Sequence, residues 1–307
     1  MTLFDLPDIT DAEDREPGPA VEGDGPESIG ARRGEAPRSG AGGPDGSGPV
    51  ERVRLVVAYD GAGFHGFAVN RGVRTVGGTL VEALVKILGH EVEITCAGRT
   101  DKGVHARAQV VTFDAAAGRV DPVLVGKSLN ALCGPDISVS DVSVVPSEFD
   151  ARFSAIARRY RYRVVNRAAP DPFRSRYAWH VDEPLSWPAL VMACDPLIGE
   201  HDFSAFCRRP KRRDGEEASL VRRVVYAGWE RVDDDELRFE IEASSFCHQM
   251  VRSVVGLLVD VGRGRRRPGE VLEIMRSQDR ARVGNLAPPQ GLTLWTVRYP
   301  GWNSDRS

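Results

Sequence analysis

The chain has few of the residues that build metal centres or disulfide frameworks. Its 307 residues include five cysteines and six histidines. No two cysteines form a CxxC pair, and the histidines lie apart, without the spacing of a zinc site. We therefore expect no metal. The odd number of cysteines predicts reduced thiols, mostly in the core, as is usual in the cytoplasm.

Long apolar runs are also missing, so no membrane span is expected. Aromatic residues make up only 7% of the chain and are almost absent from residues 1–49, which are rich in Gly, Pro, Asp and Glu. Such a segment cannot bury enough apolar surface to offset its ordering entropy, so residues 1–50 are expected to form a disordered N-terminal extension. It lacks the basic start and apolar run of a secretory signal, which favours a cytoplasmic protein.

The acidic extension hides the charge of the remaining chain. Residues 1–50 hold eleven Asp and Glu and four Arg, a net −7, whereas the whole chain carries −3. Residues 51–307 therefore carry about +4, a mild bias toward an anionic partner.

Apolar periodicity predicts two successive β-α-β-β-α-β units. In residues 51–150 the expected strands are 53–59, 92–97, 108–113 and 137–144, and the helices are 76–88 and 122–132. In residues 151–300 the expected strands are 158–165, 221–230, 236–243 and 292–297, and the helices are 187–197, 246–261 and 268–275. This order predicts an α+β fold of two tandem ferredoxin-like halves with antiparallel sheets, followed by a tail at 301–307.

A short charged loop is expected at 98–106, with the sequence Gly-Arg-Thr-Asp-Lys-Gly-Val-His-Ala. Apolar runs lead into and out of it, so a rigid scaffold would present Arg99 and Asp101, in the usual position of a catalytic group. The same residues also suit an ordinary hairpin, with Asp101 in the turn and Gly103 in the left-handed region. Taken alone, the hairpin is the simpler interpretation, but the rest of the chain favours catalysis.

Tyrosine and arginine alternate along the expected strand 158–165. Tyr160 and Tyr162 would share one face, and the arginines between them the other. One interpretation is a half-buried edge strand with inward tyrosines. The other is an RNA-binding surface, because aromatic rings stack on bases and arginines bind phosphates.

The helix expected at 246–261 is apolar almost all round, which predicts that it is buried. Arg252 within it then needs a partner, and Asp101 is the candidate. The alternative is a helix face open to solvent. Two basic runs, 208–213 and 263–267, are either solvated loops or a phosphate-binding side that includes Arg208 and Arg209.

These features occur together with further short motifs in a fixed order. The segments are 59–61 (Tyr-Asp-Gly), 98–101 (Gly-Arg-Thr-Asp), 103–106, 149–155, 159–162, 201–203, 246–256, and 287–288 before 291–292. In this order they resemble the tRNA pseudouridine synthase A family, over roughly residues 52–300.

The resemblance implies an isomerase that converts uridine to pseudouridine in the anticodon stem-loop of tRNA, without a cofactor, as a cytoplasmic homodimer. It implies Asp101 as the catalytic aspartate, Tyr160 as the tyrosine that stacks on the target base, and Arg252 as the partner of the aspartate. It also implies that Arg99 assists base flipping and that Leu292 lines the pocket.

Two positions depart from the family pattern. Phe67-Ala68 stands where Trp-Gln is usual, and Gly77 where Gln is usual. Both are expected near the RNA-facing side and would affect substrate range rather than chemistry. Two other functions stay open: a pseudouridine synthase for other RNA uridines, and a non-catalytic RNA-binding protein on the same fold. The latter would not need Asp101, Tyr160 and Arg252 together.

Overall fold

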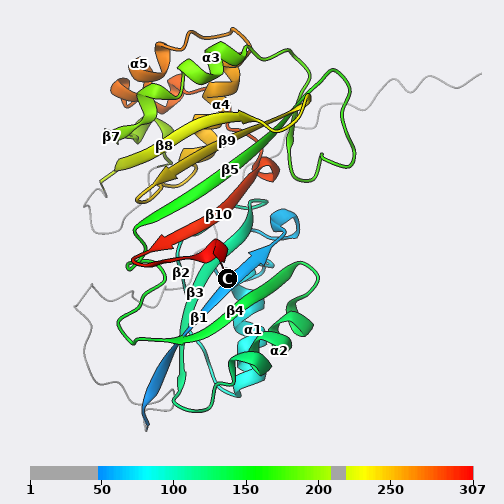
Figure 1. Ribbon diagram of the computed structural model, residues 1–307, viewed down its shortest axis with the longest axis vertical. Helices are drawn as coiled ribbons and strands as arrows, with labels where there is room; N and C mark the ends of the chain where they lie inside the picture. The colour runs from blue at the N-terminus through cyan, green and yellow to red at the C-terminus, as the bar shows by residue number, and fades with distance from the viewer. Residues whose placement is uncertain (1–47, 209–218, 307) are drawn as a thin grey trace, which may run out of the picture. The chain divides into compact units, whose positions relative to one another are not determined.

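Residues 48–208 and 219–306 are described here from a computed structural model (Figure 1). The expected disorder of the N-terminal extension thus concerns residues that lie almost entirely outside the described part. The expected boundary shifts slightly, because the first strand already begins at Val50. The part of the chain that the structure describes contains no helix long and apolar enough to cross a bilayer.

Strands and helices alternate in both halves of the chain. The first half contains β1 (Val50–Tyr59), α1 (Val76–Leu88), β2 (Thr95–Cys96), β3 (His105–Ala116), α2 (Pro122–Cys133) and β4 (Ile137–Val145). The second contains β5 (Ala157–Asn166), β6 (Trp179–Val181), α3 (Trp187–Met192), β7 (Gly199–Asp202), β8 (Val221–Arg231), β9 (Glu236–Ala243), α4 (Met250–Gly262), α5 (Glu270–Ser277), β10 (Leu292–Tyr299) and β11 (Trp302–Asn303).

The strands of the described ranges form one sheet rather than two. Its order is β4-β1-β3-β10-β5-β9-β8-β7, with β2, β6 and β11 attached to β3, β5 and β10. The expectation of antiparallel sheets was therefore incomplete. The last long strand, β10, pairs parallel with β3 through Thr293 and His105, and antiparallel with β5 on its other side. In Figure 1, β10 accordingly runs between the strands of the two halves.

Most expected elements are present, and the differences have local causes. α1 matches its expected range, with Thr75 as an N-cap that accepts from Gly78 N. Asp121 caps α2 as expected and accepts from two backbone N–H groups. Ser186 precedes α3 but makes no side-chain cap, and α3 ends at Met192 rather than at residue 197.

Two further elements differ more. The strand expected at 92–97 is only a two-residue bridge, β2. The helix expected from residue 246 begins at Met250, because Gln249 adopts a left-handed backbone with φ of 67°. Nearly every position of α4 is buried, as its all-round apolarity predicted. The expected tail at 301–307 includes β11, which pairs with β10.

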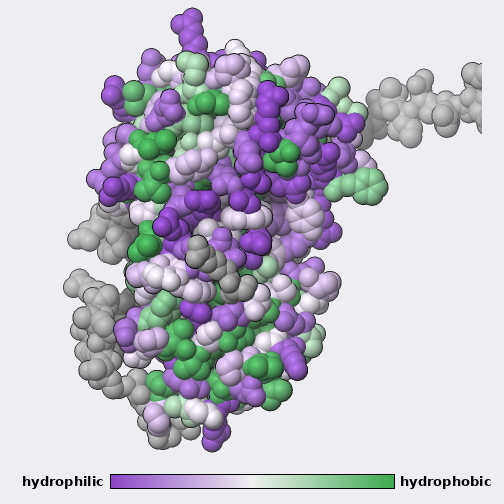
Figure 2. Space-filling model, in the orientation of Figure 1, coloured by the Kyte–Doolittle hydropathy of each residue, from purple (hydrophilic) through white to green (hydrophobic). Residues whose placement is uncertain are grey.

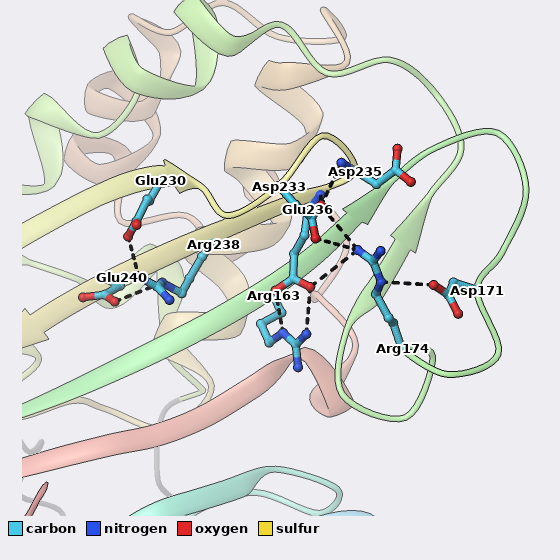
Figure 3. Close-up of polar contacts among 9 residues, drawn as sticks. All are labelled: Arg163, Asp171, Arg174, Glu230, Asp233, Asp235, Glu236, Arg238 and Glu240. Atoms are coloured by element: carbon cyan, nitrogen blue, oxygen red, sulfur yellow. Dashed lines mark hydrogen bonds and ion pairs between the residues drawn. The ribbon is translucent and has the colours of Figure 1, made fainter.

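On β5, Tyr160 and Tyr162 lie on the opposite face of the sheet from Arg159, Arg161 and Arg163. Tyr160 and Tyr162 are 8% and 0% exposed. The arginines between them pair with glutamates of β9: Arg159 with Glu242, Arg161 with Glu240 and Arg163 with Glu236. Figure 3 shows part of this network, including Arg174, which bridges Asp171, Asp233 and Glu236. These arginines form ion pairs within the protein, as the half-buried strand of the first interpretation would allow, and the RNA-surface interpretation stays a prediction.

Polarity is unevenly distributed over the molecular surface. In the view of Figure 2, hydrophilic side chains predominate over β5, β8 and β9, whereas hydrophobic ones gather over β1, β4 and α2. Val123 and Leu124 of α2 and Val144 of β4 are among the exposed apolar residues.

Candidate active site

The charged loop at 98–104 connects β2 to β3, which pair antiparallel. The hairpin interpretation is therefore correct for the backbone, and Gly103 has the expected positive φ of 79°. It does not exclude the catalytic interpretation, because the loop presents Asp101 to side chains from distant parts of the chain.

The start of the loop is held by side chains from neighbouring strands. Buried Gln109 bonds to both backbone groups of Gly98, accepting from its N–H (3.3 Å) and donating to its carbonyl (2.6 Å). The hydroxyl of Tyr59 lies 2.8 Å from that of Thr100. Arg158, 7% exposed, donates from Nε and Nη2 to the carbonyl of Ala97. The backbone that carries Asp101 is thus fixed before any substrate binds.

The Tyr-Asp-Gly motif at the end of β1 supports the other end of the loop. A Cβ on Gly61 would lie 2.0 Å from the carbonyl oxygen of Val104, so only glycine allows this approach. Asp60 accepts from Tyr177 (2.8 Å) and pairs with Arg176. Burial alone would raise the pKa of Asp60, but hydrogen bonds from Ala62 and Tyr177 and nearby positive charge lower it overall.

The carboxylate of Asp101 lies between two basic side chains. Arg252 Nη1 of α4 is 3.4 Å from Oδ2, as expected from the sequence, and Nε2 of His248 is 3.3 Å from Oδ1. Arg252 is oriented by Ala287, whose carbonyl accepts from Nε at 2.8 Å. The Asp101 side chain is 19% exposed, so it remains accessible from solvent.

Aromatic and apolar side chains surround this carboxylate. Tyr160 packs edge-on against Phe246, with ring centroids 5.0 Å apart. Burial raises the pKa of Tyr160, and the negative charge of Asp101 adds to the shift. The phenol therefore stays neutral. Leu292 is 5% exposed and pairs in register with Tyr162 rather than Tyr160. Tyr162 is a core residue whose hydroxyl donates to the Pro288 carbonyl.

The cysteines near the loop differ from expectation in one respect. Burial raises the pKa of Cys96 to about 11, so its thiol stays protonated and is no competing nucleophile. Cys207 and Cys247 form a disulfide, with Cα atoms 5.7 Å apart. The expectation that all five thiols are reduced was wrong for this pair. Since 40 residues separate the two in sequence, no motif indicated it.

The expected RNA-contacting residues are only partly brought together. Arg99 and Arg208 are exposed, and Arg208 N donates to the His248 carbonyl (3.0 Å) beside Asp101. Arg209 and the remainder of its basic run lie outside the described residues. The second run is largely ion-paired, with Arg263 and Arg265 bound to Glu183 and Arg266 near Glu270.

Of the residues that depart from the family pattern, Phe67 and Gly77 are buried, whereas Ala68 is half-buried. Phe67 is 3% exposed, and its N–H donates to the carbonyl of Thr100. Gly77 N donates to the carbonyl of Phe67, and a Cβ there would lie 2.6 Å from the same oxygen. Both positions therefore support the loop from inside, which corrects the expected location.

His248, Phe246 and Arg158 were not singled out as site residues in the sequence. His248 and Phe246 fall in a segment expected to be helical, where their convergence on Asp101 and Tyr160 could not be foreseen. Arg158 lies two residues before Tyr160 on β5, so its side chain points to the same inward face. This alternation was the sequence signal that could have indicated a buried Arg158.

A partly exposed carboxylate between two basic side chains, with an aromatic ring beside it, provides groups that a carboxylate-dependent, nucleoside-modifying enzyme needs. The comparisons with known proteins are more specific. The family model described as tRNA pseudouridine synthase matches residues 55–154 and 193–300, which is more than half of the chain, so the chain belongs to this family.

Curated relatives agree with this assignment. The chain is 39% identical over 253 residues to a protein of Brevibacillus brevis named tRNA pseudouridine synthase A, covering 81% of this chain and all of that one. It is 40% identical over 270 residues to one of the same name from Leifsonia xyli, covering 81% and 92%. A chain from the crystal structure of a Cbf5-Nop10-Gar1 complex aligns with a TM-score of 0.31 and 12% identity, over 74% of this chain and 51% of that one. That similarity is too weak to support an argument.

Proposed function

We propose that the protein isomerises uridine to pseudouridine in the anticodon stem-loop of tRNA. The observation that carries the proposal is the Asp101 carboxylate between Arg252 and His248, beside Tyr160, in a chain of this family. The curated relatives are named for the same activity on tRNA.

The reaction breaks the glycosidic N–C bond, turns the uracil and rejoins it through carbon. Asp101 as a carboxylate can attack the anomeric carbon, or take the proton from the neighbouring ribose carbon. Either route needs a charged carboxylate held in a fixed place, which Arg252 supports through its charge and its bond to Ala287. Because the product is an isomer of the substrate and there is no net oxidation or reduction, the chemistry requires no redox cofactor.

Tyr160 would contact the uracil while it turns. Its ring is fixed from the side by Phe246, and its phenol is neutral, so it offers a surface without a competing negative charge. Leu292, on the neighbouring strand, would complete the apolar side of the pocket.

The target nucleotide must leave its stack before it reaches Asp101, at a cost of a few kcal/mol. Arg99 lies in the loop that carries Asp101, Arg208 bonds to the backbone of His248, and both are exposed. Arg280 lies near Arg208: the pKa of Arg280 is lowered first by burial and then by the charge of Arg208. These arginines, with Arg209, would bind phosphates around the flipped nucleotide.

Three broader features belong to the same proposal. Two tandem ferredoxin-like halves are supported by matching strand orders, β4-β1-β3-β2 and β10-β5-β9-β8. A homodimer is proposed from the family resemblance alone, and light scattering on the purified protein tests it.

A cytoplasmic location is proposed because the substrate is tRNA. Thiols are kept reduced in that compartment, so Cys207 and Cys247 would be present there mainly as a dithiol. Counting reactive thiols in freshly lysed cells tests the location and the state of the pair together.

The decisive experiment is an assay on anticodon stem-loop RNAs and on unrelated RNA hairpins, with modified positions mapped. Pseudouridine in the stem-loops only would support the proposal. Modification of the hairpins instead would indicate a pseudouridine synthase for other RNA uridines. Tight binding without any pseudouridine would indicate a non-catalytic RNA-binding protein.

A further inference from the structure

We propose that His248 is a second positioning residue for the carboxylate of Asp101, and that it acts together with Arg252. The inference rests on the proposed function, since it concerns the rate of that reaction. Once the backbone of the loop is fixed, the side chain of Asp101 can still rotate.

The backbone of the Asp101 loop is bonded on both sides. The carbonyl of Thr100 accepts from Phe67 N, Val104 N donates to the carbonyl of Asp101, and Gly103 N donates to the carbonyl of Phe64. What remains free is rotation of the Asp101 side chain. A contact to one oxygen leaves the carboxylate able to turn about the line to that partner, whereas contacts to both oxygens fix its plane.

The two basic residues contact different oxygens. Arg252 Nη1 reaches Oδ2 at 3.4 Å, and His248 Nε2 reaches Oδ1 at 3.3 Å. They also approach from different depths, because the Arg252 side chain is 13% exposed and that of His248 is 49% exposed. His248 therefore holds the outer oxygen, on the side from which a nucleotide enters.

His248 is placed by its surroundings rather than by the helix that follows. Its carbonyl accepts from Arg208 N at 3.0 Å, Cys247 lies beside Cys207 with Cα atoms 5.7 Å apart, and Phe246 packs on Tyr160. Three successive residues thus each contact a different partner. This arrangement restricts where the imidazole can lie.

The backbone at the next residue is an independent sign of a constrained site. Gln249 has φ of 67°, a conformation that costs free energy for a residue with a side chain. A helix continued back through residue 248 would avoid this cost but would change the direction of His248. The left-handed turn at Gln249 separates His248 from α4 and permits the contact with Asp101.

The test compares His248→Ala, His248→Gln and a matched control, His180→Ala. His180 bonds to the carbonyl of Arg167 and has no recorded contact with Asp101. Single-turnover rates at saturating stem-loop RNA should fall about 10- to 100-fold in His248→Ala, the scale of a misplaced reacting group. The dissociation constant for RNA should change by less than about twofold, because a positioning role affects the chemical step. His248→Gln should recover most of the rate, since its amide can donate from a similar reach.

A second readout needs neither substrate nor turnover. The ring resonances of His248, identified by their loss in His248→Gln, should shift in substrate-free Asp101→Asn, while those of His180 stay in place. This comparison separates the two proposals. If the wild type makes no pseudouridine, the proposed function fails, and the resonances alone decide whether the pairing exists.

Three results would overturn the inference. One is an unchanged rate in His248→Ala. Another is a weaker dissociation constant with an unchanged saturated rate, which would make His248 an RNA contact. The third is the absence of any ring shift in Asp101→Asn.

Discussion

The guanidinium of Arg158 donates two hydrogen bonds to one carbonyl, that of Ala97, immediately before the loop that carries Asp101. Its Nη1 and Nη2 groups also donate to the carbonyls of Ala155, Ser244 and Arg152. A single buried side chain therefore joins the Asp101 loop to the segments before β5 and after β9. No carboxylate is recorded among its hydrogen-bond partners in the described residues, and its role there is to hold backbone in place.

Replacing Arg158 by Met should lower both stability and activity. The substitution keeps much of the buried volume but leaves four carbonyls without their donor, and each buried acceptor left unpaired costs about 1–3 kcal/mol. We expect a loss of more than about 2 kcal/mol in the free energy of unfolding, measured by urea denaturation. The control is Arg119→Met on an exposed turn. Equal stability of the two variants would contradict the role given to Arg158.

Asp101→Asn should abolish turnover while RNA binding persists. The amide keeps the size of the side chain but can act neither as nucleophile nor as base. Turnover and binding are measured on the same stem-loop, with Asp234→Asn in an exposed turn as the control. Activity within about tenfold of the wild type, equivalent to 1.4 kcal/mol, would remove Asp101 from the mechanism.

Arg252→Ala should reduce the rate and the stability, and Arg252→Lys should restore stability only in part. Alanine removes the charge beside Asp101 and the donor to the Ala287 carbonyl, whereas lysine returns a charge without the forked geometry. Both partners keep some solvent contact, so we expect a loss of about 1–3 kcal/mol rather than the larger cost of a fully buried pair. Arg276→Ala, in the last turn of α5, is the control. Melting temperatures equal to that control would show that the pair contributes nothing to folding.

Stability should fall as the pH decreases below neutrality because of His105. Burial lowers its pKa more than the charge of Asp60 raises it, and its Nδ1 accepts from Gly61 N, which requires the neutral ring. An unfolded histidine binds its proton near pH 6.5, so the unfolded state takes up the proton first and is favoured from about pH 7 downward. The lowered pKa of Asp60 acts in the same direction in the acid range, below the usual carboxyl pKa of 3.8.

The measurement is the free energy of unfolding between about pH 7.5 and 5.5, for the wild type and His105→Gln. Glutamine cannot take up the proton, so its slope should be flatter. Parallel slopes would mean that His105 is not the group that titrates.

Much of the fold could be predicted from the sequence because its periodic elements are long. α1 and α2 were found nearly residue for residue, since their caps and apolar faces agree. The short strands could not be predicted, because two to four residues are too few to show a periodic pattern. They are β2, β6, β7 and β11. The start of α4 was misplaced because nothing in the local sequence shows that Gln249 turns left-handed.

The site was predictable where a charged side chain stands in an apolar segment and so needs an oppositely charged partner from elsewhere in the chain. Arg252 in an apolar helix required a carboxylate, and Asp101 is the one it reaches. The arginines of β5 could not be assigned in the same way, because their partners come from β9, whose register beside β5 is set by the whole sheet. His248 was missed for a related reason. Its contact depends on a turn, and residues close in sequence do not specify it.

The parallel pairing of β10 with β3 has a consequence for how the protein is made. Asp101, Tyr160 and Arg252 are all synthesised before β10, yet β3 and β5 are joined in the sheet through it. A nascent or truncated chain that ends before Leu292 would hold Asp101, Tyr160 and Arg252 but would lack both Leu292 and the strand that joins β3 to β5. Its unpaired strand edges would also favour aggregation. Activity would therefore require that synthesis has passed β10, and incomplete chains would not act on tRNA.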